Sequence, residues 1–327
     1  MLEEFPPNSH YYRNLLLNMA VASAEAKRNI TVRRRESAEL LEIRPTIHIF
    51  QITPFGQLKT TLGDRIRKYC ESRGNHPFFQ VSSITAAAMA GSINDAFKVI
   101  PPLAAGFPNG TIVVDEFKTN PMEKSDAIGA ALDVIESERS SRAMARVPRN
   151  PLKSLANTGV QYEVAHGRLA FKNLRCGWVF LTAKAMEMNR SLPMAMLLSR
   201  CIPILFKPTL DEIEAIDDNP DLNFQPMHLE ATVLEEPIDN ASYLRIRSYV
   251  RENLTCRGIP ENYYLRTVND CVRAYVYSGY EHNLDLYDYI LTNKAMFVST
   301  YEKAGGDLAE LEMLAENFLD LSSGPKS

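Results

Sequence analysis

A lysine and two threonines end a short segment that follows an apolar stretch and precedes a helical pattern. Backbone N–H groups at the start of such a helix can bind phosphate oxygens. Lys59 would then reach the β- and γ-phosphates of a nucleotide, and the Thr60 hydroxyl would bind Mg²⁺. The nucleotide-binding residues predicted in this segment are Thr53, Pro54, Phe55, Gly56, Gln57, Leu58, Lys59, Thr60 and Thr61.

This segment departs at two positions from the GxxxxGK[ST] pattern of phosphate-binding loops. Thr53 and Leu58 stand where that pattern has glycines, which permit positive φ angles and a close approach of the backbone to phosphate. Gly56 occupies the place of the extra glycine in a common variant of the pattern. A surface loop that leads into a helix without binding nucleotide is the alternative interpretation.

Two acids end the apolar stretch Gly110–Phe117. A carboxylate at the end of a buried strand is costly unless a ligand or partner compensates for its burial. We predict that Asp115 holds Mg²⁺ through water, and that Glu116 orients and activates the attacking water. The alternative is a strand that ends in two solvated acids.

Five short apolar stretches are expected to be the strands that position these residues. They alternate with helical patterns, which is typical of an α/β fold with a parallel five-stranded sheet and flanking crossover helices. The predicted strands are Thr46–Ile52, Phe78–Ser82, Thr111–Asp115, Trp178–Thr182 and Ile202–Phe206.

The chain divides into three predicted parts. Residues 1–45 read as an N-terminal helical extension, residues 46–225 as the α/β core, and residues 226–327 as a helical C-terminal subdomain with a tail. Pro208–Pro237, an acidic and proline-containing stretch, reads as a connector between the last two parts.

Composition narrows the class of protein. The 327 residues are 45% hydrophobic and 23% charged, which is typical of a soluble globular protein. The net charge of −4 excludes a globally basic nucleic-acid binder but allows a local basic surface. The acidic first residues do not resemble a signal peptide, and we expect an intracellular, cytoplasmic protein without a membrane partner. The five cysteines lack the spacing of a zinc clip.

Taken together, these motifs resemble the AAA+ ATPases, and most of all the ATPase core of the minichromosome maintenance (MCM) helicases. Gly56–Thr60 is similar to that family's PGTAKS-type loop, and Gly110–Phe117 is similar to its strand ending in IDEF. Leu192–Cys201 resembles its LPxxLLSRF segment, and Tyr263–Arg266 lies where a second sensor arginine is expected. The resemblance covers roughly residues 46–290.

The resemblance implies a P-loop NTPase fold with a helical lid, ATP and Mg²⁺ as cofactors, and a ring, usually a hexamer, with ATP bound between subunits. Arg200 would be the arginine finger that acts on the neighbour's ATP, and Arg266 would contact nucleotide. Lys184, with Thr182 nearby, stands where the family has a polar sensor of the γ-phosphate, usually asparagine. The alternative for Arg200 is a helix-terminal arginine that bonds backbone carbonyls.

A basic segment follows the predicted acidic strand end, in a region where the resembled family has inserted hairpins that line the ring's pore. Such a segment can track a nucleic-acid backbone, and the alternative is a solvated surface loop. The predicted DNA contacts are Arg139, Arg142, Arg146, Arg149 and Lys153.

The motifs favour an ATP-driven ring that acts on nucleic acid as a helicase, a translocase or a replication-associated ATPase. The DNA-binding modules of the resembled helicases do not fit into the 45 residues before the core, so we expect a separate DNA-binding or loader protein as a partner. Two alternatives remain open. One is an AAA+ ATPase that remodels or assembles proteins, and the other is a nucleotide-binding scaffold with little or no hydrolysis.

Overall fold

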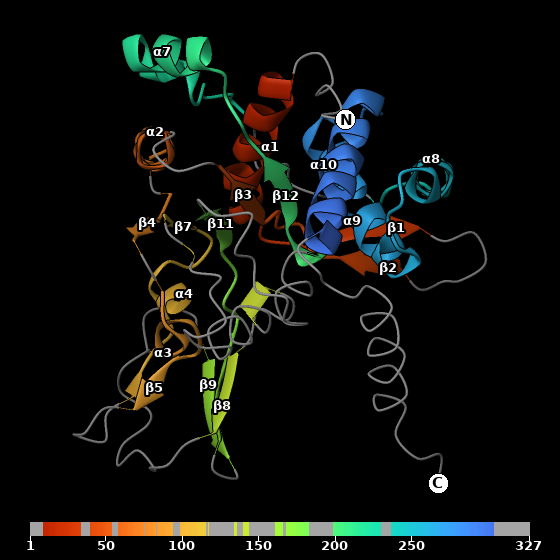
Figure 1. The fold of residues 1–327 in the computed structure, drawn as a ribbon. Helices are drawn as coiled ribbons and strands as arrows, with labels where there is room; N and C mark the ends of the chain where they lie inside the picture. The colour runs from red at the N-terminus through yellow and green to blue at the C-terminus, as the bar shows by residue number, and fades with distance from the viewer. Residues whose placement is uncertain are drawn as a thin grey trace, which may run out of the picture.

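The computed structural model shows a central sheet flanked by helices (Figure 1). The residues that the structure describes are 9–33, 40–53, 58–74, 76–82, 84–93, 99–115, 117, 134–135, 140–143, 161–165, 168–182, 199–229 and 237–303.

The central sheet has five parallel strands in the order β12-β3-β11-β7-β4. These strands match the five predicted apolar stretches, within one residue at every end except the start of the first, where the strand begins at Ile49 and not at Thr46. The match confirms the α/β class and the parallel sheet. Their bounds are β3 (Ile49–Ile52), β4 (Phe78–Val81), β7 (Thr111–Val114), β11 (Gly177–Thr182) and β12 (Ile202–Leu205).

Helices cover both faces of the sheet, which is why its strands are almost continuously apolar. On one face, α1 (Ser9–Ala24) and α2 (Lys59–Ser72) pack against alternate strand residues such as Val113. On the other face, α3 (Ala86–Ala90) and α4 (Leu103–Gly106) contribute to a core that includes Trp178 and Phe180. α1 has no solvated side over most of its length, since Tyr12 to Ala24 are all buried.

Three helices form the C-terminal part of the described chain, beside the β12 edge of the sheet (Figure 1). They are α8 (Asn240–Cys256), α9 (Tyr264–Tyr277) and α10 (Leu284–Lys303), with the short 3-10 helix η3 (Glu261–Tyr263) before α9. α10 packs on β12, where the Leu205 N–H donates to Asn293 Oδ1 at 2.9 Å. This agrees with the helical pattern predicted there, and residues 304–327 lie outside the described residues.

Two segments differ from the expectation. Within residues 1–45, α1 is helical, but β1 (Ile30–Arg33) and β2 (Leu40–Ile43) form an antiparallel pair, so the helical prediction is wrong for these strands. Val32 also bridges to Ile238, which fixes the pair against the start of the helical part. The predicted connector contains helix α7 (Leu210–Asp218) and the 3-10 helix η2 (Pro220–Leu222).

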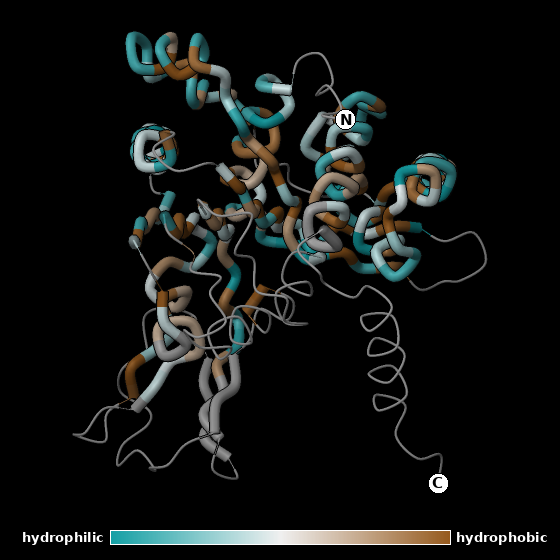
Figure 2. The backbone as a smooth tube through the Cα atoms, in the orientation of Figure 1, coloured by the Kyte–Doolittle hydropathy of each residue, from teal (hydrophilic) through white to brown (hydrophobic). Residues whose placement is uncertain are grey.

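Smaller antiparallel sheets lie at the bottom of Figure 1, away from α7. They are formed by β8 (Ser140–Ala143), β10 (Arg168–Lys172) and β9 (Gln161–Ala165), and by β5 (Ser92–Ile93) and β6 (Val99–Ile100). Figure 2 shows hydrophilic residues on the peripheral helices α7 and α8. Within the described part of the chain, no helix combines the length and apolar character needed to cross a bilayer.

Candidate functional site

The loop after β3 lies where the direction of the chain connections reverses. From β3 the chain passes to β4 at the far edge, returns through β7 to β11 beside β3, and then crosses to β12 on the other side. In open parallel sheets, ligands bind outside the carboxyl ends of the strands at such a switch point. The predicted nucleotide-binding segment therefore starts at the position that this topology favours for a ligand.

The start of α2 has the features of an anion site. Leu58 is the residue before the helix, with a left-handed backbone (φ 61°) and no side-chain hydrogen bond that caps the helix. The next three residues, Lys59, Thr60 and Thr61, form the first turn, whose N–H groups have no acceptor within a helix and which holds no acid. The predicted residues Pro54, Phe55, Gly56 and Gln57 lie outside the described residues.

Asp115 lies at the carboxyl end of β7, against the same helix. Its N–H donates to the Val81 carbonyl at 2.9 Å, and Gln80 Nε2 donates to its Oδ2 at 2.7 Å. A Cβ atom at Gly63 would lie 3.0 Å from Asp115 Oδ1 and 2.5 Å from Gln80 Nε2. Since Lys59 is four residues before Gly63, it lies on the helix face that meets this carboxylate.

Thr53 and Thr182 are neighbours at the same carboxyl ends of the strands, which we call the carboxyl edge of the sheet. The Thr53 N–H donates to the Thr182 carbonyl at 2.9 Å, which extends the pairing of β3 with β11 by one residue. Both side chains are buried. The structure thus brings Thr53, Thr182, Asp115 and the start of α2 to one edge of the sheet, while Glu116 and Lys184 lie outside the described residues.

Arg13 of α1 supports both ends of the loop. Its Nε donates to Gln51 Oε1 at 3.0 Å, and its Nη1 and Nη2 donate to the carbonyl and Oδ1 of Asn223 at 2.9 and 3.1 Å. Gln51 Nε2 in turn donates to Thr53 Oγ1 at 2.9 Å, and Asn223 Nδ2 donates to the Leu58 carbonyl at 3.0 Å. One guanidinium therefore connects to the residues on either side of positions 54–57.

Arg13 is 2% exposed, and its guanidinium carbon lies 3.9 Å from the ring centre of Phe206. Burial lowers the pKa of Arg13 to about 10, so the group stays charged at neutral pH. Sequence reasoning missed this residue. Its signal is a basic residue at the start of an almost wholly apolar helical stretch, where a charge needs buried partners.

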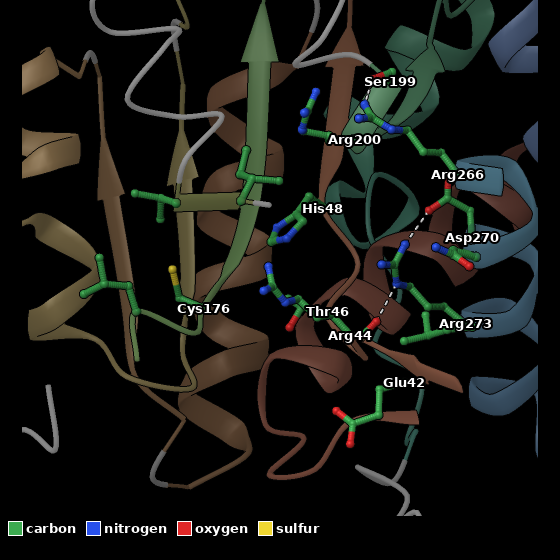
Figure 3. A pocket seen from close by; sticks show the side chains of 15 residues that line it. Glu42, Arg44, Thr46, His48, Cys176, Ser199, Arg200, Arg266, Asp270 and Arg273 are labelled. Atoms are coloured by element: carbon green, nitrogen blue, oxygen red, sulfur yellow. Dashed lines mark hydrogen bonds and ion pairs between the residues drawn. The ribbon is translucent and has the colours of Figure 1, made fainter. Parts of the chain in front are cut away.

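The two predicted arginines, Arg200 and Arg266, lie at the other ends of the strands, the amino ends, which we call the amino edge of the sheet. The Ile202 N–H at the start of β12 donates to the His48 carbonyl at 2.8 Å, so Arg200 lies beside the amino end of β3. Arg266 Nη1 donates to Ser199 Oγ, and both arginines line one cavity (Figure 3).

This placement separates Arg266 from the predicted nucleotide loop. His48 and Thr53 flank β3, and a strand rises by about 3.3 Å per residue, so the two edges are roughly 16 Å apart. Within one chain the structure does not bring Arg266 together with Lys59, as a shared nucleotide site requires. Arg266 and Arg200 instead belong to one group of side chains.

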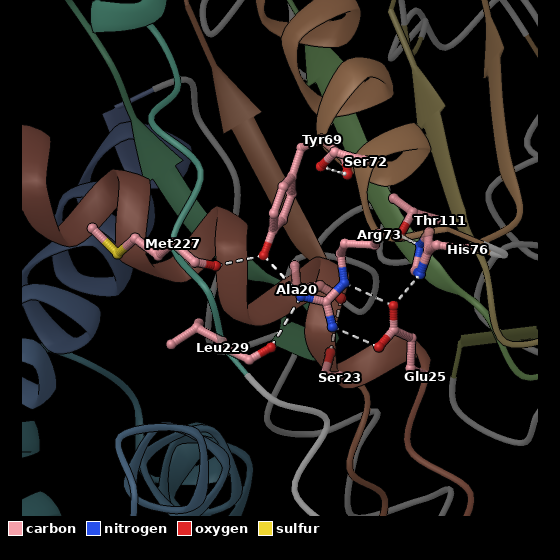
Figure 4. Close-up of polar contacts among 10 residues, drawn as sticks. All are labelled: Ala20, Ser23, Glu25, Tyr69, Ser72, Arg73, His76, Thr111, Met227 and Leu229. Carbon is pink, nitrogen blue, oxygen red and sulfur yellow. Dashed lines mark hydrogen bonds and ion pairs between the residues drawn. The ribbon is translucent and has the colours of Figure 1, made fainter.

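A second cluster has the order carboxylate, imidazole, hydroxyl, as in nucleophilic triads (Figure 4). Glu25 Oε1 lies 2.7 Å from His76 Nδ1, and His76 Nε2 lies 2.9 Å from Thr111 Oγ1. Arg73 also donates to both oxygens of Glu25. Because Thr111 is fully buried, its hydroxyl cannot reach a substrate, and the cluster ties the ends of α1 and α2 to the start of β7.

Of the predicted DNA contacts, the structure describes one. Arg142 lies in β8, opposite Leu169 of β10. The other four, Arg139, Arg146, Arg149 and Lys153, lie outside the described residues. Arg175, another basic residue of this part of the chain, donates to the Ala26 carbonyl and Asn29 Oδ1 at 3.0 Å and so has a structural role.

No protein-family model matches this sequence, and a search of curated proteins finds no significant match. The function is therefore inferred from the motifs and geometry of this chain.

Proposed function

We propose that this chain is an ATP-hydrolysing AAA+ ring motor that acts on nucleic acid, of the kind represented by the MCM helicases. The observation that carries the proposal is the meeting of the start of α2 with Asp115 at the switch point of a parallel sheet. A lysine, an uncapped helix start and a carboxylate on one strand end are the parts that phosphoryl transfer requires.

The residues present fit Mg²⁺ and ATP. The first-turn N–H groups of α2 and Lys59 suit phosphate oxygens, and the absence of acid from that turn favours an anion. Mg²⁺ in phosphate sites is held by one or two protein oxygens and keeps several waters. Thr60 and Asp115 can provide these protein oxygens. When bound, ATP supplies the phosphoryl group that is transferred to water.

The remaining roles belong to this chain's own side chains. Glu116, next to Asp115, would orient the attacking water and accept its proton. Thr182 adjoins Thr53 through the backbone and would provide a polar group near the terminal phosphate, together with Lys184. Arg13 would position the two ends of the loop, Thr53 and Leu58, through Gln51 and Asn223.

A ring would place Arg200 near the nucleotide of the adjacent subunit. Because Arg266 shares its cavity with Arg200, Arg266 would meet that same nucleotide and not the one bound by its own chain. Hydrolysis would then depend on assembly, and the predicted basic residues from Arg139 to Lys153 would contact DNA in the pore.

The ATPase rate per subunit, measured against protein concentration with and without single-stranded DNA, tests the proposal. We expect the rate per subunit to rise with concentration and to increase when DNA is added. Glu116→Gln should bind ATP but lose hydrolysis. Stimulation by unfolded polypeptide and not by DNA would instead support a protein-remodelling ATPase. Absence of ATP binding at millimolar nucleotide would refute the proposal and leave a scaffold.

A further inference from the structure

Residues 223–229, which we call the strap, follow the 3-10 helix η2 and lie against α1 and α2. Side chains of the two helices bind backbone atoms at every second residue of the strap. The strap residues bound in this way are Asn223, Gln225, Met227 and Leu229. Because the bonds go to backbone atoms, the helices fix the course of the strap itself.

The contribution of α1 is a pair of asparagines one helical turn apart. Asn14 Oδ1 accepts from the Gln225 N–H at 2.9 Å, and Asn14 Nδ2 donates to the Gln225 carbonyl at 2.8 Å. Asn18 Oδ1 accepts from the Met227 N–H at 2.8 Å. Both asparagines are buried. The two strap N–H groups are therefore shielded from water, and they exchange with it only when the strap leaves α1.

The contribution of α2 comes from its C-terminal end (Figure 4). The Tyr69 hydroxyl donates to the Met227 carbonyl, and Arg73 Nη1 donates to the Leu229 carbonyl at 3.0 Å. Figure 4 shows both side chains directed at the strap. Since the other end of the strap bonds at the beginning of α2, the strap spans this helix from start to end.

Asn223 connects the strap to the start of α2. The residue is buried, its Nδ2 donates to the Leu58 carbonyl at 3.0 Å, and its Oδ1 accepts from Arg13 Nη2 at 3.1 Å. The Leu58 carbonyl also accepts from the Leu62 N–H at 3.0 Å. Leu58 has a φ of 61°, which is costly for a bulky residue and persists only where the surroundings hold it. Asn223 is part of what holds it.

These bonds form a chain in which every donor points toward the start of α2. The Arg13 guanidinium donates to the Asn223 amide, which donates to the Leu58 carbonyl. The N–H of that same peptide group belongs to Lys59, in the first turn of α2, and points away from the carbonyl. Hydrogen bonds in a chain polarise one another, so each donation strengthens the next. An anion at this first turn would strengthen the bond between Asn223 and Leu58.

We propose that Asn223 is a positioning residue that couples nucleotide binding at the start of α2 to the strap. The coupling rests on the proposed function, because the nucleotide phosphate is the anion concerned. Nucleotide binding tightens the hold of α1 and α2 on the strap. Coupling between two binding events is reciprocal, so complete release of the strap lowers the nucleotide affinity by the same factor. A movement that draws the strap off the two helices would thus favour nucleotide release.

Amide hydrogen exchange of the full chain, with and without Mg²⁺ and ADP, tests the coupling. ADP is the probe because no hydrolysis then intervenes. The N–H groups of Gln225 and Met227 report on the strap, since each donates to an asparagine of α1. We expect saturating ADP to slow their exchange about tenfold, which is a common size for coupling between sites. Asn223→Leu should weaken ADP binding about tenfold and abolish the slowing even at saturating ADP.

The matched control is Asn253→Leu. Asn253 Nδ2 donates to the Tyr249 carbonyl at 2.8 Å within α8, so the same change removes the same kind of bond elsewhere. The control should keep both the ADP affinity and the slowing. Circular dichroism establishes that each variant is folded, and Asn223→Ala replaces Asn223→Leu if the latter is not.

Two results would overturn the coupling alone. One is unchanged exchange of the strap N–H groups in a chain that binds ADP. The other is an equal slowing at saturating ADP in the Asn223 variant, because ADP would then stabilise the protein in general and not through Asn223. Absence of ADP binding by the unchanged chain would overturn the proposed function together with the coupling.

Discussion

The two edges of the central sheet hold different kinds of polar groups. At the carboxyl edge, Asp115, Thr53 and Thr182 accompany a helix start with one lysine. At the amino edge, four arginines and a histidine line one cavity. The same sheet thus presents mainly backbone and neutral groups at one end and mainly cationic side chains at the other.

Helix direction explains the difference. In a parallel sheet with crossover helices, each helix after a strand begins at the carboxyl edge and returns toward the amino edge. The positive ends of the helix dipoles and their unpaired N–H groups therefore gather at the carboxyl edge, where an anion needs few cations. At the amino edge the helices end with carbonyl groups, which favour cationic side chains such as arginine.

The largest expected difference between the edges concerns hydrolysis. Arg200→Ala should lower the ATPase rate about 1,000-fold, the effect of losing an arginine finger, and leave nucleotide affinity unchanged. Lys59→Ala should lose affinity itself. Mixing the two inactive proteins tests the assignment, because a ring containing both has some interfaces with an intact lysine and an intact arginine. Activity should return on mixing. Equal loss of nucleotide affinity in both variants would contradict the division of roles.

The next prediction concerns the free energy of unfolding and the buried ion pair between Lys294 and Asp270, which lies behind the amino edge. Lys294 is 1% exposed and Asp270 is 3% exposed. Lys294→Met removes a partner of a buried carboxylate, which costs about 3 kcal/mol in free energy of unfolding. Urea denaturation measures the loss. The control is Arg251→Gln at an exposed site, which should stay within about 0.5 kcal/mol. An unchanged unfolding midpoint for Lys294→Met would show that Arg273 alone satisfies Asp270.

At the carboxyl edge, Arg13→Met should show whether Arg13 positions the nucleotide-binding loop or only stabilises the protein. It removes three hydrogen bonds to Gln51 and Asn223 and costs about 2 kcal/mol of stability. The loop between Thr53 and Leu58 also loses its support, and we expect nucleotide affinity to fall about tenfold. Lys294→Met is the matched control, because it destabilises the protein from the other edge. Similar affinity in both variants would reduce Arg13 to a structural residue.

The pH dependence of stability should report on the amino edge. The folded-state pKa of His48 is about 3, lowered by burial, Arg273 and Arg44, while the unfolded value is about 6.5. Between these values the unfolded chain binds a proton that the folded chain does not, so stability should fall as pH drops from about 6.5 toward 3. Arg200, Arg266, Asp270 and Glu42 line the same cavity.

His48→Gln should flatten this dependence between pH 6.5 and 4.5, where Glu25 does not yet contribute. Burial of Glu25 opposes its ionisation, but the hydrogen bonds from Arg73 and His76 outweigh this and lower its pKa to about 2. Its stabilising effect is present above about pH 4.5 and is lost as pH falls toward 2. Thermal unfolding at several pH values measures both windows, and an unchanged slope in His48→Gln would contradict the assignment.

The sheet could be predicted because each strand is a local apolar run with turn residues on either side. The motif residues could also be placed, since Lys59 follows the first of these runs and Asp115 ends the third. The same local reasoning failed for β1 and β2. Residues 1–45 as a whole read as a helical extension, whereas the strand pairing there is fixed by contacts such as Val32 with Ile238.

Long-range contacts account for the rest of what the sequence concealed. Arg13 meets Asn223, 210 residues away, and no local pattern in either segment indicates the other. The cavity at the amino edge likewise combines His48 with α9. Helix α7 is a different case, because Thr209 and Glu212 form a capping box that is readable in the sequence. The acidic, proline-containing composition around it obscured that signal.

The smallest effect is expected at Gly63, where helix propensity favours alanine but the close contact with Gln80 disfavours it. Alanine in a helix interior is favoured over glycine by up to about 1 kcal/mol. A Cβ at this position would lie 2.5 Å from Gln80 Nε2, so the amide must move and its bond to Asp115 breaks. Gly63→Ala should therefore change the free energy of unfolding by less than about 1 kcal/mol.

The functional consequence should exceed the change in stability. Without Gln80, Asp115 is held less firmly, and the Mg²⁺ concentration needed for half-maximal hydrolysis should rise several-fold. Gly106→Ala is the control, because a Cβ there meets nothing within 4 Å. An unchanged Mg²⁺ dependence in Gly63→Ala would mean that the Gln80–Asp115 bond serves the packing of β4 on β7.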